Sequence, residues 1–131
     1  MFSNSHEGRL TSPGHAIEAM WFMLDLSQKY KDEDLCQKAI ATGLKTLEYG
    51  WDKAYGGIYY FLDILGHPSE KLEWNQKLWW VHLETLVFLS KAYAITGNND
   101  CLQWFYKVHD YTWNHFKDPE SLEWFGYLDR Y

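Results

Sequence analysis

His15 and Glu18 are the first side chains along the sequence whose types and spacing suit acid/base chemistry. They lie three residues apart in a segment with helical periodicity, so they share one helix face, which Phe22 and Asp25 continue. Polar groups in an otherwise apolar helix must meet a partner or a cavity. The N-terminal position of His15 favours the neutral imidazole that a base needs. A histidine held in a structural hydrogen bond is the alternative.

A second polar set lies on a later helix, expected from Gln76 to Thr96. A rotation of 100° per residue places on one face Lys77, Trp80, Val81, Glu84 and Phe88. We expect Glu84 and Trp80 to face a cavity, with Lys77 as the charge partner that a buried carboxylate requires. A plain intrahelical salt bridge is the alternative for Lys77 and Glu84. His82 points away from this face and is expected to be structural.

Four helices would carry these residues. Periodicity predicts nearly apolar helices from Pro13 to Lys31 and from Gln76 to Thr96, each followed by an amphipathic helix, from Asp32 to Glu48 and from Asn98 to Phe116. Because a helix that is apolar nearly all round is buried, the first and third helices are expected inside. A strand-like run follows each pair, at 58–62 and 123–128, and no partner strand is expected after the second run.

The two halves of the chain repeat at an offset of 66 residues. Superposition pairs Glu18 with Glu84, Phe22 with Phe88, Asp34 with Asp100, Thr46 with Thr112, Asp52 with Asp118, and Leu62-Asp63 with Leu128-Asp129. The matches indicate a genuine repeat of inner helix, outer helix and hairpin. An inner helix is buried on all sides only between stacked units, which predicts a helical toroid or solenoid. Since two units cannot close a ring, residues 1–131 are expected to be part of a larger domain.

Composition excludes several function classes. Aromatic residues make up 19% of the chain, a surplus that often lines a ligand cavity, although an aromatic core is the alternative. The net charge of −6 argues against a nucleic-acid partner. No apolar run could span a bilayer and no signal peptide is evident, so a cytoplasmic protein without a membrane partner is expected. Cys36 and Cys101 lack the spacing of a zinc or redox site; they are expected to be buried, and no metal is expected.

Four motifs follow one another along the chain: GRLTSPGHAIEA at 8–19, GGIYYF at 56–61, LEWNQKLWWVHLE at 72–84, and DPE at 118–120 with EWFGYL at 123–128. Together they resemble the N-acylglucosamine 2-epimerase family, also known as renin-binding proteins, over nearly the whole chain from Gly8. The third and fourth motifs are more similar to the N-acylglucosamine enzymes than to the related cellobiose 2-epimerases and mannose isomerases. Ser12 departs from the family, which more often has Asn at this position.

The resemblance implies an all-α fold, part of an (α/α)6 toroid with a central sugar-binding cleft, in which each helical hairpin is followed by a short β-hairpin. It implies that N-acyl-D-glucosamine and N-acyl-D-mannosamine are interconverted by removing and returning the C2 proton of the ring-opened sugar, with two histidines as acid/base groups. His15 matches the first histidine and Glu84 an essential glutamate. The substrate-binding residues expected from the resemblance are Glu18, Trp80, Lys77 and Trp79.

The resemblance also implies that the second histidine lies beyond the last strand-like run and an important arginine before Gly8, so the chain alone is expected to be inactive. No cofactor is expected for the chemistry, while ATP as an allosteric activator and a homodimeric assembly are carried over from the family. Two alternatives stay open. One is a related aldose/ketose isomerase or cellobiose 2-epimerase, and the other is a non-catalytic protein-binding module of the same fold.

Overall fold

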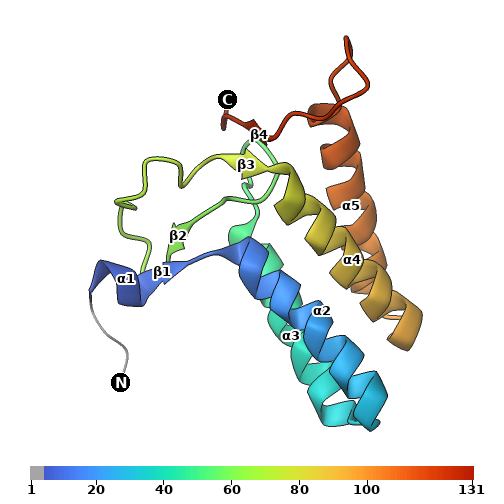
Figure 1. Ribbon diagram of the computed structural model, residues 1–131. Helices are drawn as coiled ribbons and strands as arrows, with labels where there is room; N and C mark the ends of the chain where they lie inside the picture. The colour runs from blue at the N-terminus through green and yellow to red at the C-terminus, as the bar shows by residue number, and fades with distance from the viewer. Residues whose placement is uncertain (1–4) are drawn as a thin grey trace.

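The computed structural model describes residues 5–131, in which four long helices form two antiparallel hairpins (Figure 1). These helices are α2 (Pro13–Tyr30), α3 (Glu33–Gly50), α4 (Trp79–Thr96) and α5 (Asn99–His115). The helices α2 and α4 contact each other, while α3 packs on α2 and α5 packs on α4. The predicted inner and outer helices are therefore confirmed.

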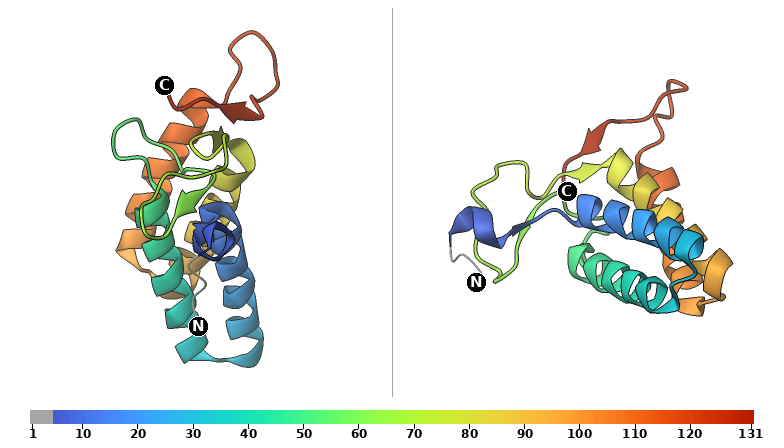
Figure 2. Two further views of the ribbon diagram at one scale, coloured as in Figure 1. Left: turned by 90° about the vertical axis from the view of Figure 1, so that its left-hand side faces the viewer. Right: turned by 60° about the horizontal axis from the view of Figure 1, so that its bottom comes forward.

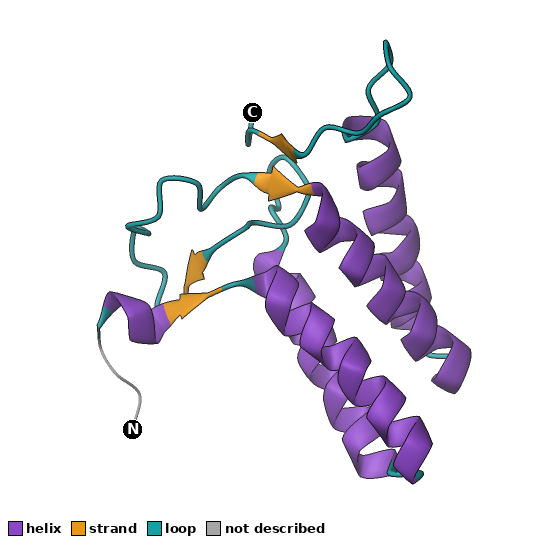
Figure 3. Cartoon of the chain, in the orientation of Figure 1, coloured by secondary structure: helices purple, strands orange, loops and turns teal. Residues whose placement is uncertain are grey.

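Short elements connect the hairpins. In chain order they are α1 (His6–Arg9), β1 (Leu10–Thr11), β2 (Leu62–Asp63), β3 (Lys77–Leu78) and β4 (Tyr127–Leu128). The strand β1 pairs antiparallel with β2, and β3 pairs in the same way with β4. Figures 2 and 3 show that these strands and loops gather at one end of the helices, where α2 and α4 begin.

The strands differ from the sequence-based expectation. Of the run at 58–62 only Leu62 enters a strand, and of the run at 123–128 only the last two residues, β4. The earlier part of each run forms a single bridge, Trp51 with Ile58 and Lys117 with Trp124. No partner strand was expected after the second run, and the partner of β4 is β3, which precedes it in the chain. Each run ends beside the segment that enters an inner helix.

The 66-residue repeat is present in the structure. Shifting both ends of α2 by this offset gives both ends of α4. The same shift converts the bridge Trp51–Ile58 into Lys117–Trp124, and the strand pair Thr11–Leu62 into Lys77–Leu128. Because helix ends, bridges and strand register all repeat, the two halves are copies of one structural unit.

The core lies where α4 meets the first hairpin. Phe88 on α4 is fully buried and lies over Gly43 of α3, where an added Cβ would come within 2.2 Å of the aromatic ring. Phe22, the equivalent residue one repeat earlier, is 47% exposed, since the described residues place no preceding unit against α2. Cys36 and Cys101 are buried and unpaired, as expected. Across residues 5–131, every helix is too short or too polar to cross a membrane.

A buried ion pair joins the two repeats. Lys77 Nζ lies 3.1 Å from Asp52 Oδ2, with side-chain exposures of 0% and 1%, and 3.6 Å from the Tyr59 ring centroid. Arg130 Nε donates to the same Asp52 oxygen at 2.8 Å. Burial lowers the pKa of Lys77 to about 8. Burial alone would raise the pKa of Asp52, but hydrogen bonds from Arg130, Tyr59 and Lys77 outweigh it and hold that pKa well below its usual value.

This pair corrects the placement of Lys77. The helix α4 begins at Trp79 rather than Gln76, so Lys77 lies in β3, off the helix face to which the periodicity assigned it. The predicted ion pair between Lys77 and Glu84 is wrong, because Lys77 binds Asp52. The carboxylate of Asp52 is buried beside β3. Helical periodicity relates residues within one helix, so it carries no information about a partner so distant in sequence.

Replacing Asp52 with Asn should destabilise the chain by about 3–5 kcal/mol, because it leaves the buried Lys77 ammonium without its counter-charge. Asp118→Asn is the matched control. Asp118 is the equivalent residue in the second repeat, but its carboxylate accepts hydrogen bonds from its near neighbours in an exposed turn, the Glu120 amide and the Ser121 hydroxyl. We expect the control to cost at most about 0.5 kcal/mol. Urea unfolding followed by circular dichroism measures both, and equal losses would contradict the proposed role of the buried pair.

Candidate functional site

Four aromatic and acid/base side chains lie where α2 contacts α4. We call this set, His15, Trp21, Trp80 and Glu84, the α2–α4 row. The His15 imidazole lies 5.0 Å from the Trp80 indole between ring centroids, at an interplanar angle of 51°. One helical turn after Trp80, the Glu84 carboxylate accepts a hydrogen bond of 2.7 Å from Trp21 Nε1. Each contact crosses from α2 to α4, so helix packing brings the predicted His15 and Glu84 to one surface.

Glu18 and an ion pair extend this surface along the helices. Glu18 lies three residues after His15 and three before Trp21, so it belongs to the same stretch of α2 and is half-buried. Further along, Lys91 Nζ lies 2.5 Å from Asp25 Oδ1 and 5.1 Å from the Trp21 ring centroid. Asp25 and Lys91 therefore bound the α2–α4 row on the side away from His15.

Two residues at the start of α2 explain why His15 comes so close to α4. Pro13 occupies the first turn of the helix, where its missing N–H costs nothing. At Gly14, an added Cβ would lie 2.7 Å from Val81 Cγ2 and 3.0 Å from the Trp80 ring. Only a residue without a side chain allows this approach of the two helices. His15 follows directly, with its Nδ1 3.0 Å from Ser12 Oγ.

The α2–α4 row is more open to solvent at His15 than at its other residues. His15 is exposed, whereas Glu18, Trp80 and Glu84 are half-buried. A catalytic group must reach its substrate, and this gradient leaves the imidazole accessible while the carboxylate is held by the indole of Trp21. In the described part of the chain, no cluster of three or more His, Cys, Asp or Glu side chains could hold a metal ion.

Two of the residues predicted from the sequence lie outside the row. Lys77 is fully buried against Asp52, as described above. Trp79 is 42% exposed and lies in a neighbouring groove of about 460 Å³, with Leu83, Glu123 and Trp124. The structure thus places Trp80 against His15, Glu84 one helical turn further along α4, and Trp79 beside the second hairpin loop.

His82 is a structural histidine, as expected from its direction on the helix. Its Nε2 accepts a hydrogen bond from the Ile58 amide at 3.0 Å, and its Nδ1 lies 2.8 Å from the Leu78 carbonyl oxygen. These two partners require the tautomer with the proton on Nδ1. The side chain is fully buried, and burial lowers the pKa of His82 to about 3. The ring therefore ties α4 to the first hairpin loop in its neutral form.

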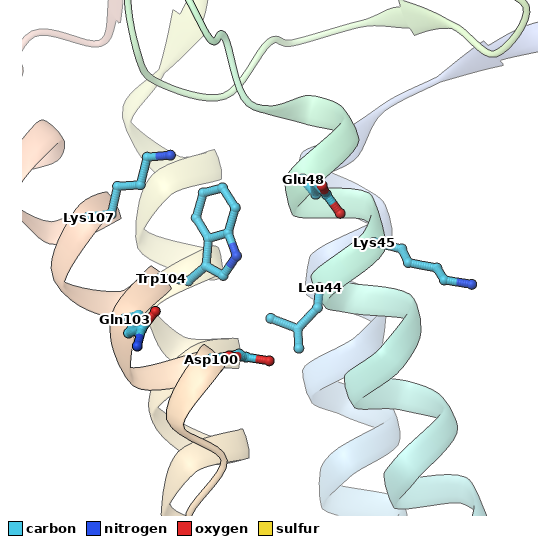
Figure 4. Close-up of a pocket in the computed structure, with 7 residues that line it drawn as sticks. All are labelled: Leu44, Lys45, Glu48, Asp100, Gln103, Trp104 and Lys107. Carbon is cyan, nitrogen blue, oxygen red and sulfur yellow. The ribbon is translucent and has the colours of Figure 1, made fainter.

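A separate groove of about 380 Å³ lies between the outer helices α3 and α5 (Figure 4). Its lining residues are Leu44, Lys45, Glu48, Asp100, Gln103, Trp104 and Lys107. Lys107 Nζ lies 4.4 Å from the Trp104 ring centroid, whereas Lys45 extends away from both, as the close-up shows. None of the site residues predicted from the sequence lines this groove, so it is not the candidate active site.

Sequence reasoning missed two important partners. The apolar pattern of its helix accounts for Trp21, and only the need of Glu84 for a hydrogen-bond donor could have pointed to it. Asp52 stands out in the sequence only as a match to Asp118. A buried lysine requires a carboxylate, but spacing alone does not distinguish Asp52 from the rest of the eighteen Asp and Glu residues.

Comparisons with known proteins identify similar chains. The sequence profile described as N-acylglucosamine 2-epimerase (GlcNAc 2-epimerase) matches residues 2–131. The N-acylglucosamine 2-epimerase of Mus musculus is 42% identical over 124 residues, which are 94% of this chain and 30% of that protein. The Homo sapiens protein of the same name is 40% identical over 94% of this chain and 29% of its own length. The chain thus spans about 30% of the length of these relatives.

Solved structures share the fold. A D-mannose isomerase superposes with a TM-score of 0.80 at 22% identity, covering 92% of this chain and 30% of the isomerase. The cellobiose 2-epimerase of Bacillus thermoamylovorans B4167 gives a TM-score of 0.71 at 23% identity, with the same two coverages. Because both superpose over nearly the whole of this chain, the predicted all-α fold class, part of an (α/α)6 toroid, is confirmed.

Lowering the pH from about 7.5 to about 5 should destabilise the chain through His82. Its folded pKa, about 3, lies below the ordinary 6.5, so its contribution is full above pH 6.5 and is lost as the pH falls toward 3. At pH 5 this one group accounts for about 2 kcal/mol. Urea unfolding at both pH values measures the change. A His82→Asn variant should be less stable at pH 7.5 but less sensitive to pH, and an equal sensitivity would contradict the assignment.

Proposed function

The chain belongs to the N-acylglucosamine 2-epimerase family, and on that premise we propose that it carries one half of a sugar 2-epimerase site, with His15 as a base at C2. N-acyl-D-glucosamine and N-acyl-D-mannosamine differ only in configuration at C2. Removing the C2 proton of the ring-opened sugar is feasible because the neighbouring C1 carbonyl can accept the negative charge as an enolate. The observation that carries this proposal is a pair of contacts between two neighbouring inner helices, in which His15 packs on Trp80 and Glu84, one helical turn after Trp80, accepts a hydrogen bond from Trp21.

His15 suits the role of the base by position and accessibility. It is exposed, lies at the first turn of α2, and packs against the Trp80 indole. Ring contact with Trp80 restricts the orientation of the imidazole, and a fixed base reacts faster because less motion is lost in the transition state.

Glu84 and its neighbours would bind the sugar. Trp21 holds one carboxylate oxygen, Oε2, which leaves Oε1 to accept a hydrogen bond from a sugar hydroxyl. Trp80 offers an apolar face of the kind on which sugar C–H groups pack, and Glu18 adds a second carboxylate to the same surface. We assign proton transfer to His15, and orientation of the open-chain sugar to Glu84, Trp80 and Glu18.

Lys77 and Trp79 would act less directly. Because Lys77 has no exposed surface, we propose that it holds β3, and through β3 the start of α4, rather than touching the sugar. Trp79 lines the groove beside Glu123 and Trp124, where it could contact a part of the substrate remote from C2. In these assignments Lys77 supports substrate binding indirectly, and Trp79 contacts the substrate away from C2. Neither residue takes part in proton transfer.

Inversion at C2 needs a second acid/base group on the opposite face of the enolate. By the family resemblance this group is a histidine that does not match any position of the chain, so the proposal assigns only one of the two proton transfers to it. The reaction is a proton exchange and requires no redox or group-transfer cofactor. Activation by ATP, assembly as a homodimer and a cytoplasmic location are proposals that rest on the resemblance alone.

Another sugar substrate is the alternative within the same chemistry. Glucose and mannose, like the two N-acyl sugars, differ at C2, and the solved relatives include a D-mannose isomerase and a cellobiose 2-epimerase. Removal of the C2 proton by His15 would serve those sugars as well. The identity of the relatives with the higher sequence similarity favours the N-acyl sugars.

A chimera tests the proposal. Replacing the matching segment of the Mus musculus enzyme with this chain should give a protein that interconverts N-acetyl-D-glucosamine and N-acetyl-D-mannosamine, measured by proton NMR. His15→Ala in the chimera should lower the rate by about 10²–10⁴-fold, the usual contribution of a general base. The same assay with glucose, mannose and cellobiose decides between the candidate substrates.

His109→Ala is the matched control, since His109 is a half-buried histidine on the outer helix α5 and stacks on Trp113. It should leave the rate unchanged. The 131-residue chain alone should not form N-acetyl-D-mannosamine at a rate near that of the chimera, because only one face of C2 has a base. A cooperatively folding chimera whose rate is unaffected by His15→Ala would refute the proposal.

A further inference from the structure

Ser12 stands at a position where a serine usually stabilises a helix, yet its side chain is used differently. It is the residue that precedes α2, and a serine there normally accepts a hydrogen bond from a backbone amide of the first turn. Asp32 and Asn98 do so for α3 and α5. The Ser12 hydroxyl makes no such bond and lies instead 3.0 Å from His15 Nδ1.

The direction of the hydrogen bond between Ser12 and His15 decides which ring nitrogen carries the proton. If the hydroxyl donates to Nδ1, the proton of the neutral ring is on Nε2, and the Nδ1 lone pair is occupied by this hydrogen bond. If the hydroxyl oxygen accepts, Nδ1 carries the proton and Nε2 keeps a free lone pair. The positive end of α2 attracts the negative oxygen end of the hydroxyl dipole. The hydroxyl oxygen is thereby oriented to accept a hydrogen bond, which the ring donates from Nδ1–H.

We propose that Ser12 is a positioning residue that accepts the Nδ1–H of His15 and so leaves Nε2 as the basic atom of the imidazole. The contact with Trp80, 5.0 Å between ring centroids, holds the ring from the other side. Ser12 and Trp80 together fix both the tautomer and the orientation of the ring. This inference deepens the proposed function, on which the use of Nε2 as a base at C2 rests, but the tautomer itself is independent of any sugar.

The residue type at this position can vary within that role. The side-chain oxygens of Thr and Asn can accept a hydrogen bond from Nδ1 in the same way as the hydroxyl oxygen of Ser12. Alanine cannot. Ser12→Thr and Ser12→Asn should therefore preserve the tautomer, whereas Ser12→Ala should lose it. Free imidazole side chains prefer the proton on Nε2, so the loss is expected to reverse the major form.

The experiment records the ring nitrogens of the ¹⁵N-histidine-labelled 131-residue chain by long-range ¹H–¹⁵N correlation NMR above neutral pH. His15 is assigned by loss of its signals in His15→Gln. The native chain, Ser12→Thr and Ser12→Asn should show the proton of His15 mainly on Nδ1, and Ser12→Ala mainly on Nε2. His82 is an internal control in every spectrum, because the Ile58 amide and the Leu78 carbonyl fix its tautomer wherever the chain is folded.

Two results would overturn the inference. One is a native chain in which His15 carries its proton mainly on Nε2. The other is a His15 tautomer that stays on Nδ1 in Ser12→Ala while the His82 signals remain native. If Ser12→Ala unfolds, the native chain and the two conservative variants still decide. Because no sugar is present, failure here leaves the proposed function standing with another group as the determinant of the tautomer, and an inactive chimera leaves the tautomer result standing.

Discussion

The close packing of α2 against α4 is the contact on which the rest of the structure depends. At Gly14 the two helices approach so closely that a Cβ would overlap Val81 and Trp80. A β-branched valine cannot rotate away easily, so the fit leaves little freedom for the helices to slide. The contacts of His15 with Trp80 and of Trp21 with Glu84 both cross this boundary. The candidate site therefore exists only when the two repeats are packed together.

A second, electrostatic contact holds the repeats together at their loop end. Lys77 enters from the strand before α4, Asp52 lies in the loop after α3, and Arg130 returns from the end of the second unit to the same carboxylate. Buried charges of this kind contribute little net stability compared with an apolar core, but each requires its partner. They consequently select one relative placement of the repeats. The candidate site on the inner helices depends on that placement. The strands and charged loops stabilise the placement from one end of the helices.

The sequence predicts the parts of the fold that local periodicity controls. The four helices, the 66-residue repeat and the outward direction of His82 from the site all follow from the spacing of residues along helices, and the structure has them. Contacts between elements do not follow from spacing. Helical periodicity pairs Lys77 with Glu84 because both fit one helical face. In the structure, Lys77 binds Asp52 of the other repeat. The pairing of β4 with β3 and the hydrogen bond from Trp21 to Glu84 likewise join segments far apart in sequence.

The most direct measurement of the central contact compares two glycine variants by nuclear Overhauser spectroscopy and urea unfolding. Close packing at Gly14 predicts that Gly14→Ala loses about 1–3 kcal/mol of stability and weakens the cross-peak between the His15 and Trp80 rings. Gly126→Ala is the control, since nothing lies within 4 Å of its added Cβ, and it should keep both. A Gly14→Ala chain with native stability and a full-strength His15–Trp80 cross-peak would contradict the view that this approach of α2 and α4 assembles the site.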